Sequence, residues 1–134
     1  MEMILNEDYC KIVYEKDINL MTLTWLKHPS PEEYKYAFTK RVEAIKKYKI
    51  PKLITDTRKE GVVSPSSKKW LETVAIPEAV QGGLKYVASV LDHDAFKKYY
   101  LTKIKSTSEQ VGMEFKIFDN NLEEALNWIL SKPN

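Results

Sequence analysis

The sequence is poor in cysteine and histidine, and these shortages exclude several kinds of chemistry. The single cysteine, Cys10, has no partner for an internal disulfide and no neighbouring CxxC motif. The two histidines, His28 and His93, do not have the spacing of metal ligands, so we expect neither a metal nor another cofactor. Residues 1–8 do not read as a targeting leader. Together these features predict a cytoplasmic protein.

Arginine is also scarce, because only Arg41 and Arg58 are arginines among the 21 basic residues, and the net charge is only +2. Nucleic-acid-binding domains rely on arginine for base contacts and on patterned aromatic residues, so we expect no nucleic-acid partner. No apolar run reaches the roughly 20 residues that a membrane-spanning helix needs. Residues 97–105 mix lysine with tyrosine and predict a solvated helix face, with contact to an anionic membrane surface or a partner as the alternative.

The rest of the composition is that of an ordinary globular protein. The chain has 134 residues, of which 43% are hydrophobic and 30% are charged. A chain of this length can bury a core without disulfides or metals. No linker or repeat interrupts it, so we predict a single domain over residues 1–134.

Strand and helix patterns alternate along the chain. Ser30, Pro31 and Glu33 form a capping box with proline at the first helical position, which starts a helix that ends near Lys49. Ser64 and Pro65 start a second helix in the same way, and Pro77 is expected to break or kink it. The predicted strands are residues 9–14, 19–26, 52–57, 86–91 and 113–117, and the later helices are residues 95–110 and a segment from 120 or 121 onward. Helical spacing predicts an inner face for three of the helices: Tyr34, Phe38, Val42, Ile45 and Tyr48 in the first, Phe96, Tyr99, Tyr100 and Ile104 in residues 95–110, and Leu122, Ala125, Leu126, Ile129 and Leu130 in the last. This order predicts an α/β fold: a mixed sheet with parallel inner strands and about four helices packed against it.

Several short segments, taken in order, resemble a known family. They are Ser30-Pro31-Glu32-Glu33-Tyr34, Asp56-Thr57-Arg58, Ser64-Pro65 with Trp70, Gly83-Leu84-Lys85-Tyr86-Val87-Ala88, and Phe118-Asp119-Asn120-Asn121-Leu122-Glu123-Glu124-Ala125, with Trp25 ending a hairpin strand. The chain is similar to the SpoIIAA-like, STAS/SEC14-type domains over nearly its whole length. This resemblance implies a STAS-like fold and a regulatory module that binds a protein partner or a small ligand.

The resemblance also implies a serine switch in outline. In the anti-sigma antagonist branch a serine at a helix start is phosphorylated, and the matching region here is residues 62–67. The Asp-Ser-Ser-Gly run of that branch is absent, so Ser64, Ser66 and Ser67 are candidate phosphorylation sites only by position. The alternative is that Ser64 is a plain helix cap.

Asp56 and Arg58 are the first candidate binding residues, because ligands of open α/β sheets bind beyond the carboxyl ends of the strands. Ser64 and Trp70 complete the predicted ligand- or partner-binding set. The alternative for Asp56 is that it caps a turn and pairs with Arg58 or a lysine. Trp70, like Trp25 and Trp128, is typical of core packing, although one of the three could mark a contact surface.

A catalytic role has less support in the sequence. Asp92, His93 and Asp94 follow a strand and could orient an imidazole as an acid or a base. The alternative is that Asp94 caps the next helix, and no nucleophile can be matched to His93. We therefore expect no enzyme and no catalytic residues.

The leading functional hypothesis is a non-catalytic regulatory or protein-interaction module that binds a protein partner or a small ligand. The alternative is a small-ligand or lipid carrier of the SEC14-like type. The carrier hypothesis predicts an apolar cavity lined by residues such as Trp25, Phe38 and Trp70, in a chain with little room beyond its own core. A symmetric homodimer is an assembly that small regulatory domains often adopt, and we keep it as a hypothesis.

Overall fold

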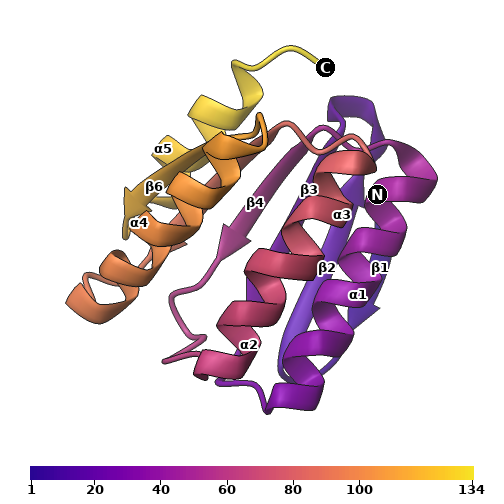
Figure 1. The fold of residues 1–134 in the computed structure, drawn as a ribbon. Coiled ribbons are helices and arrows are strands. Elements are labelled where there is room, and N and C mark those ends of the chain that lie inside the picture. Colours follow the sequence, from indigo (N-terminus) through magenta and orange to yellow (C-terminus); the bar gives the residue numbers. More distant parts are fainter.

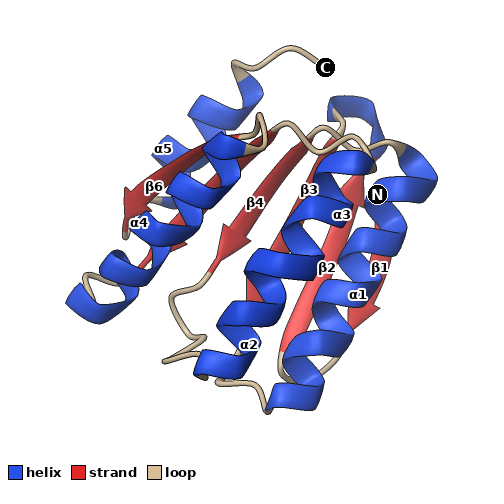
Figure 2. Cartoon of the chain, in the orientation of Figure 1, coloured by secondary structure: helices blue, strands red, loops and turns tan.

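The computed structural model describes the backbone of all 134 residues and every side chain except those of residues 95 and 96. Its centre is one six-stranded sheet, flanked by helices (Figures 1 and 2). The strands lie side by side in the order in which they follow one another along the chain: β1 (Glu2–Asn6), β2 (Cys10–Glu15), β3 (Leu20–Trp25), β4 (Lys52–Asp56), β5 (Tyr86–Leu91) and β6 (Glu114–Asp119).

The sheet is mixed. Strands β1, β2 and β3 pair antiparallel, whereas β3, β4, β5 and β6 pair parallel. The predicted α/β fold with parallel inner strands is therefore confirmed. Strand β1 was not predicted, because only Leu5 of its five side chains is buried and the segment carries no strong alternating pattern.

The strand order determines which face each helix covers. Successive parallel strands joined in one direction by right-handed crossovers place all their helices on one face. That face carries α1 (Pro31–Tyr48), α2 (Pro65–Trp70), α3 (Ile76–Gln81) and α4 (Ala95–Gln110), as Figure 1 shows. Helix α5 (Leu122–Leu130) follows the last strand and packs on the opposite face, so the sheet has a separate apolar cluster on each side.

The sequence predicted that Pro77 would break or kink the helix between β4 and β5, and the helix continues past Pro77 without a break. Its middle, Leu71–Ala75, is a π-helical turn that joins α2 to α3 without interruption. Proline lacks the N–H that the preceding turn would use, and a π-helical turn re-routes the hydrogen bonds around that gap. The capping box at Ser30 and the N-cap at Ser64 are both present as predicted.

Two predicted helix faces differ from the structure. In α4 we expected Phe96, Tyr99, Tyr100 and Ile104 on the inner stripe, but Tyr99 is exposed, and the side chain of Phe96 lies outside the described residues. Lys97, Tyr100, Leu101, Ile104 and Ser108 form the buried face instead. In α5 the buried residues are Ala125 and Ile129, whereas Leu122, Leu126 and Leu130, also expected inside, are exposed.

In the described residues, no helix combines the length and the apolar character needed to cross a membrane.

Candidate functional site

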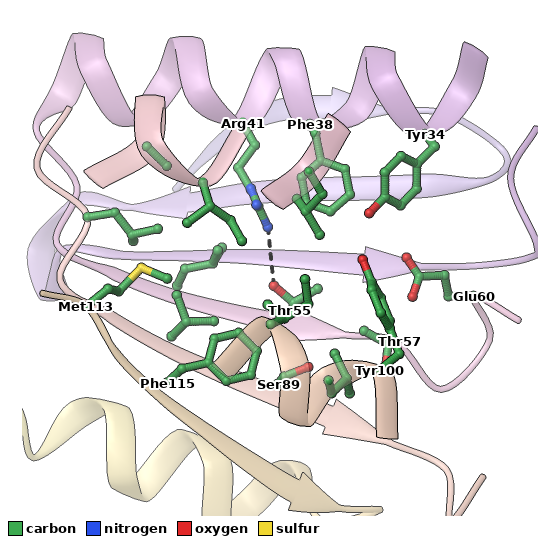
Figure 3. A pocket seen from close by; sticks show the side chains of 18 residues that line it. Tyr34, Phe38, Arg41, Thr55, Thr57, Glu60, Ser89, Tyr100, Met113 and Phe115 are labelled. Atoms are coloured by element: carbon green, nitrogen blue, oxygen red, sulfur yellow. Dashed lines mark hydrogen bonds between the residues drawn. The ribbon is translucent and has the colours of Figure 1, made fainter. Parts of the chain in front are cut away.

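A small cavity lies inside the protein, between the helix-covered face of the sheet and the helices above it (Figure 3). Its volume is about 50 Å³. A cavity needs only about 10–15 Å³ to hold one water molecule, so this cavity has room for more than a single water. Side chains from α1, α3, α4, β4, β5 and β6, and from the loop after β4, line it.

The floor of the cavity carries two hydroxyl groups in an otherwise apolar sheet. Thr55 of β4 and Ser89 of β5 are register neighbours in the parallel pair, and both side chains are buried. Leu53 and Val87 belong to the same face, because side chains two residues apart in a strand point the same way.

Arg41 reaches into the cavity from α1, where it lies one turn after Phe38 on the buried stripe. Its side chain is almost completely buried, with 5% of the residue exposed. Nη1 donates a long hydrogen bond of 3.5 Å to Thr55 Oγ1, and the guanidinium lies 4.0 Å from the centre of the Phe38 ring. Nε has no hydrogen-bond partner among the described residues. Burial lowers the pKa of Arg41 to about 10.

One end of the cavity is polar. The side chains of Tyr34, Tyr100 and Glu60 meet there, and the two tyrosine hydroxyls point toward one another beside the carboxyl group (Figure 3). Burial raises the pKa of both tyrosines, and in the described part of the chain the Tyr100 hydroxyl has no partner within hydrogen-bond geometry. Burial also raises the pKa of Glu60 to about 8, although the positive charges of Lys97 and Arg41 oppose that shift. At neutral pH the Glu60 carboxyl is therefore mostly protonated.

The other end of the cavity is apolar. Met113, just before β6, and Phe115, in β6, lie there (Figure 3). Both side chains are buried. The cavity thus has a hydrocarbon end, a cation in the middle, and a hydroxyl and carboxyl end.

The loop of residues 57–64 holds Glu60 in place. Lys97 Nζ donates to the Thr57 carbonyl at 2.8 Å, and His28 Nδ1 donates to the Glu60 carbonyl at 2.7 Å. Gly61 has a φ of +78°. A Cβ at this position would lie 2.8 Å from His28 Nδ1, so both the backbone conformation and the space require glycine.

A second hollow lies between the polar end of the cavity and the protein surface. It has a volume of about 30 Å³ and shares four residues with the internal cavity: Thr57, Glu60, Tyr100 and Leu101. Its other residues include Val62, which is 63% exposed, and Lys68. The side chains at the polar end therefore separate the cavity from an outer hollow that the loop covers.

The predicted pair Asp56 and Arg58 lies at the carboxyl end of β4, where the two side chains bind each other. Arg58 Nη2 donates to Asp56 Oδ2 at 2.7 Å, and Arg58 Nε donates to Oδ1 at 3.0 Å. Arg58 Nη1 also donates to Asn120 Oδ1 at 3.4 Å. The hydrogen bonds to Asp56 raise the pKa of Arg58. This geometry matches the alternative in which Asp56 pairs with Arg58, and a role in partner binding stays a prediction.

The three predicted serines cluster at the start of α2. Ser64 Oγ accepts a hydrogen bond from the Ser67 backbone N–H at 3.2 Å, as an N-cap does, and donates to Ser67 Oγ at 3.0 Å. Ser66 is exposed, whereas Ser67 is buried. Of the three hydroxyl groups, that of Ser66 is the most accessible to a modifying enzyme.

Trp70 is half-buried at the end of α2 and lies apart from Asp56 and Arg58 in its contacts. It packs edge-on against Tyr34 and Phe38, with ring centres 6.4 Å apart in each case. Trp25 stacks on Tyr34 from the sheet side. Phe38 thus lines the cavity as the carrier hypothesis predicted, whereas Trp25 and Trp70 pack behind its lining.

The Asp92-His93-Asp94 segment lies outside the cavity. His93 is exposed, and its Nδ1 lies 3.1 Å from Asp119 Oδ1. Asp94 accepts a hydrogen bond from the Lys97 backbone N–H, which is the capping role given as the alternative. Asp92 pairs with Lys97 Nζ at 3.2 Å.

The remaining candidates have structural environments. Cys10 is fully buried, and burial raises its pKa to about 12. Trp128 is partly buried against Phe118 on the α5 face. Among the described residues, no cluster of histidine, cysteine and carboxylate side chains has the arrangement of a metal site.

Sequence reasoning missed Arg41 and Glu60 as site residues. Arg41 had a detectable signal, because a charged residue occupies a position on the apolar stripe of α1 next to Phe38 and Val42. Glu60 had none, since it lies in a loop whose path depends on contacts with His28 and Lys97, far away in the sequence.

No family model, curated protein or solved structure matches this chain. The resemblance to STAS domains therefore stays a prediction, and the site has to be interpreted from its own geometry.

Proposed function

We propose that this chain is a non-catalytic binding domain that holds a small ligand in the internal cavity. The observation that carries the proposal is the buried Arg41 guanidinium, which faces the cavity with one long hydrogen bond and a free Nε. Burying a charge is costly unless it is paired and fully hydrogen-bonded. A ligand in the cavity would supply the missing partners.

The surroundings of Arg41 support this proposal. No described side chain forms an ion pair with it, and the nearby Glu60 carboxyl is mostly neutral at pH 7 because of its raised pKa. The described direct contacts of Arg41 are the Thr55 hydroxyl and the Phe38 ring. Small-molecule sites typically combine an apolar lining with a few converging polar groups, as this cavity does.

The environments of the reactive side chains favour binding over catalysis. The Cys10 thiol is buried with a raised pKa, which makes it a poor nucleophile. His28 Nδ1 is engaged by the Glu60 carbonyl, and His93 lies at the surface beside Asp119. Neither imidazole belongs to the cavity lining.

Native mass spectrometry of the protein purified from its own host tests the proposal. We expect a native mass that exceeds the denatured mass by one small molecule. An Ala79→Leu variant should lose that increment, because Ala79 lines the cavity and the larger side chain fills it. Val74→Leu, on the same continuous helix but exposed, is the matched control and should keep the increment. Equal native and denatured masses in the wild-type protein would contradict the proposal.

A regulatory or protein-interaction role is the second candidate function, and the loop of residues 57–64 favours it. The loop places Glu60 in the cavity wall while Val62 is 63% exposed on the outer side. A ligand that moves Glu60 would therefore change the surface next to Ser64 and Ser66. The predicted partner-binding residues Asp56, Arg58, Ser64 and Trp70, phosphorylation of the serines, and a homodimer remain proposals of this second function.

A photo-crosslinking residue placed at Val62 tests the regulatory role in the native host. We expect a discrete cross-linked partner that depends on the cavity, and hence disappears in the Ala79→Leu background. The same probe at Tyr36, which is exposed on α1, should give no such product. Identical products from both positions would show that the contact is nonspecific and would contradict a docking role for the loop.

A further inference from the structure

The chemistry of the cavity restricts which ligand it can hold. This inference rests on the proposed binding function, since it assigns the ligand class of the same cavity. Arg41 provides one positive charge, and its planar guanidinium can bind both oxygens of a carboxylate at once. Its long bond to Thr55 and its free Nε leave that capacity largely unused.

A second donor lies at the polar end. The Tyr100 hydroxyl faces the Tyr34 hydroxyl without meeting strict hydrogen-bond geometry in the described residues (Figure 3), and its raised pKa keeps it protonated. A phenolic O–H and a guanidinium that face the same space suit a single anionic group. The Glu60 carboxyl, which is mostly protonated at neutral pH, adds little negative charge against such an anion.

The rest of the lining limits the charge and the size of the ligand. A second negative charge would have to lie near Met113 or Phe115, where no charged side chain of the described lining would stabilise it. A volume of about 50 Å³ has room for only a few heavy atoms. The ligand therefore carries one charge at one end and a short hydrocarbon at the other.

We propose that the cavity binds a short-chain monocarboxylate, such as propionate, with its carboxylate on Arg41 and Tyr100 and its hydrocarbon end toward Met113 and Phe115. A long-chain fatty acid does not fit the enclosed volume, and a dicarboxylate places charge in the apolar end. Arg41 fixes the position of the carboxylate, and the distance from Arg41 to the apolar end limits the chain length.

The four methionines provide a direct readout. Met113 lines the cavity, whereas Met1 and Met3 are exposed and Met21 is buried elsewhere in the core. In protein labelled with ¹³C at the methionine methyl groups, titration with propionate should shift the Met113 signal saturably. The Met1 and Met3 signals should stay fixed, because they report nonspecific effects. Propionamide, a neutral molecule of the same shape, and malonate, a dianion, should cause little shift at the same concentrations.

The two arginines form a matched pair of variants. Arg41→Met should weaken propionate binding about tenfold or more, since it removes a charge-assisted hydrogen bond. Arg58→Met makes the same change of charge at the surface pair with Asp56 and should leave the affinity within about twofold, because Arg58 lies outside the cavity. Loss of binding in Arg58→Met alone would place the anion at the strand end and overturn the assignment.

The comparison of ligands in the wild-type protein does not depend on how the variants fold. If propionamide shifts Met113 as strongly as propionate does, the cavity binds a neutral ligand: the carboxylate assignment fails and the binding function stands. If neither molecule nor any host-derived ligand occupies the cavity, both proposals fail.

Discussion

Arg41 carries a charge that its neighbours stabilise only weakly. The contact of its guanidinium with the Phe38 ring and the long hydrogen bond to Thr55 offset part of the free-energy cost of burying the charge. The lowered pKa of Arg41 reflects the part of that cost that is not offset. Replacing a buried charge by an apolar side chain of similar length is often neutral or stabilising. At this position, therefore, the demands of binding and of stability oppose each other.

The Arg41→Met variant is accordingly expected to be more stable than the wild-type protein when no carboxylate is present. We expect a gain of about 1–3 kcal/mol in the free energy of unfolding, measured by urea denaturation. Arg58→Met should instead lose up to about 1 kcal/mol, because it breaks a partly exposed pair with Asp56. A loss in Arg41→Met larger than that in Arg58→Met would mean that Arg41 stabilises the fold and is not held there at a cost.

Glu60 makes the stability of the protein depend on pH. Its pKa is 4.5 ordinarily and about 8 in the folded protein, chiefly because of burial. Between these values the unfolded chain has lost the proton while the folded protein keeps it, so the free energy of unfolding falls as the pH rises. Below 4.5 the contribution is fully present, and above about 8 it is lost.

Glu60→Gln removes this titration. We expect the variant to resemble the wild type near pH 4.5 and to exceed its stability at pH 8 by a few kcal/mol, on the order of 3. Urea denaturation of both proteins across this range measures the difference. Parallel stability profiles would show that Glu60 titrates normally and that its carboxyl is not neutral in the cavity wall.

At the level of single residues, the sequence identifies part of the site. Tyr34 and Phe38 follow from helical periodicity, and Arg41 follows from the same stripe once a charge on it is treated as a signal. Tyr100 was placed on the correct face of α4, but the basic stretch around it was predicted to be solvated. Lys97 instead turns inward to the Thr57 carbonyl, a partner 40 residues away that no local pattern reveals.

Among the structural elements, the loop of residues 57–64 connects the cavity to the surface. It is held by the hydrogen bond from His28 to the Glu60 carbonyl and by the left-handed conformation of Gly61. Because Glu60 and Gly61 are adjacent, a substitution at Gly61 should shift the position of Glu60 at the polar end of the cavity.

Gly61→Ala is expected to destabilise the protein by about 2 kcal/mol or more, since it adds a collision with His28 to the cost of a positive φ. Gly112→Ala is the matched control, because Gly112 has a φ of +86° and no atom lies within 4 Å of the added Cβ. It should lose only about 1 kcal/mol. Thermal or urea unfolding of the two variants measures the difference in their free energies of unfolding, which is attributable to the contact with His28. Equal losses would mean that the loop moves aside without cost to avoid His28.

Most elements could be predicted because caps and periodicity are local signals. The capping box at Ser30, the N-cap at Ser64, the hairpin strands β2 and β3 and the parallel strands β4 and β5 all have such signals. The missing signals belong to β1, a mostly exposed edge strand, and to the π-helical turn, since Pro77 indicates a disturbed helix but not the form that the disturbance takes. In α5 the apolar residues have the spacing of a core-facing stripe, but only Ala125 and Ile129 in its middle are buried, and the leucines beside them are 38–42% exposed.

At the scale of the whole molecule, the strand order explains where the cavity lies. Consecutive parallel strands place α1, α3 and α4 on one face, and the cavity occupies the space where these helices converge over β4 and β5. Its polar end lies toward the carboxyl ends of these strands, the edge that the sequence analysis selected. That analysis chose Asp56, whereas its neighbours Thr55 and Thr57 line the cavity, because successive side chains along a strand alternate between faces.

The same architecture couples ligand binding to pH through the groups that face the polar end. Tyr34 and Arg41 come from α1, and Lys97 and Tyr100 come from α4. The raised pKa values of both tyrosines keep them neutral near pH 8, and Arg41, with a pKa of about 10, stays charged. Glu60 is thus the acidic group of this set that gains a negative charge as the pH rises through about 8.

An ionised Glu60 would attract Arg41 and repel a bound carboxylate, so the affinity for propionate should fall as the pH rises through about 8. We expect a decrease of roughly tenfold or more, because two unit charges about 10 Å apart or closer repel by about 1.7 kcal/mol or more at an effective dielectric of about 20. Propionate itself is fully ionised throughout this range, since its carboxyl resembles that of a free glutamate. Titrations followed by the Met113 methyl signal measure the affinity at each pH.

Glu60→Gln should bind propionate with an affinity that does not change over the same interval, because glutamine keeps the shape of the side chain and cannot ionise. If the variant retains the pH dependence of the wild type, another group controls entry of the anion, and the coupling between the loop and the cavity does not pass through Glu60.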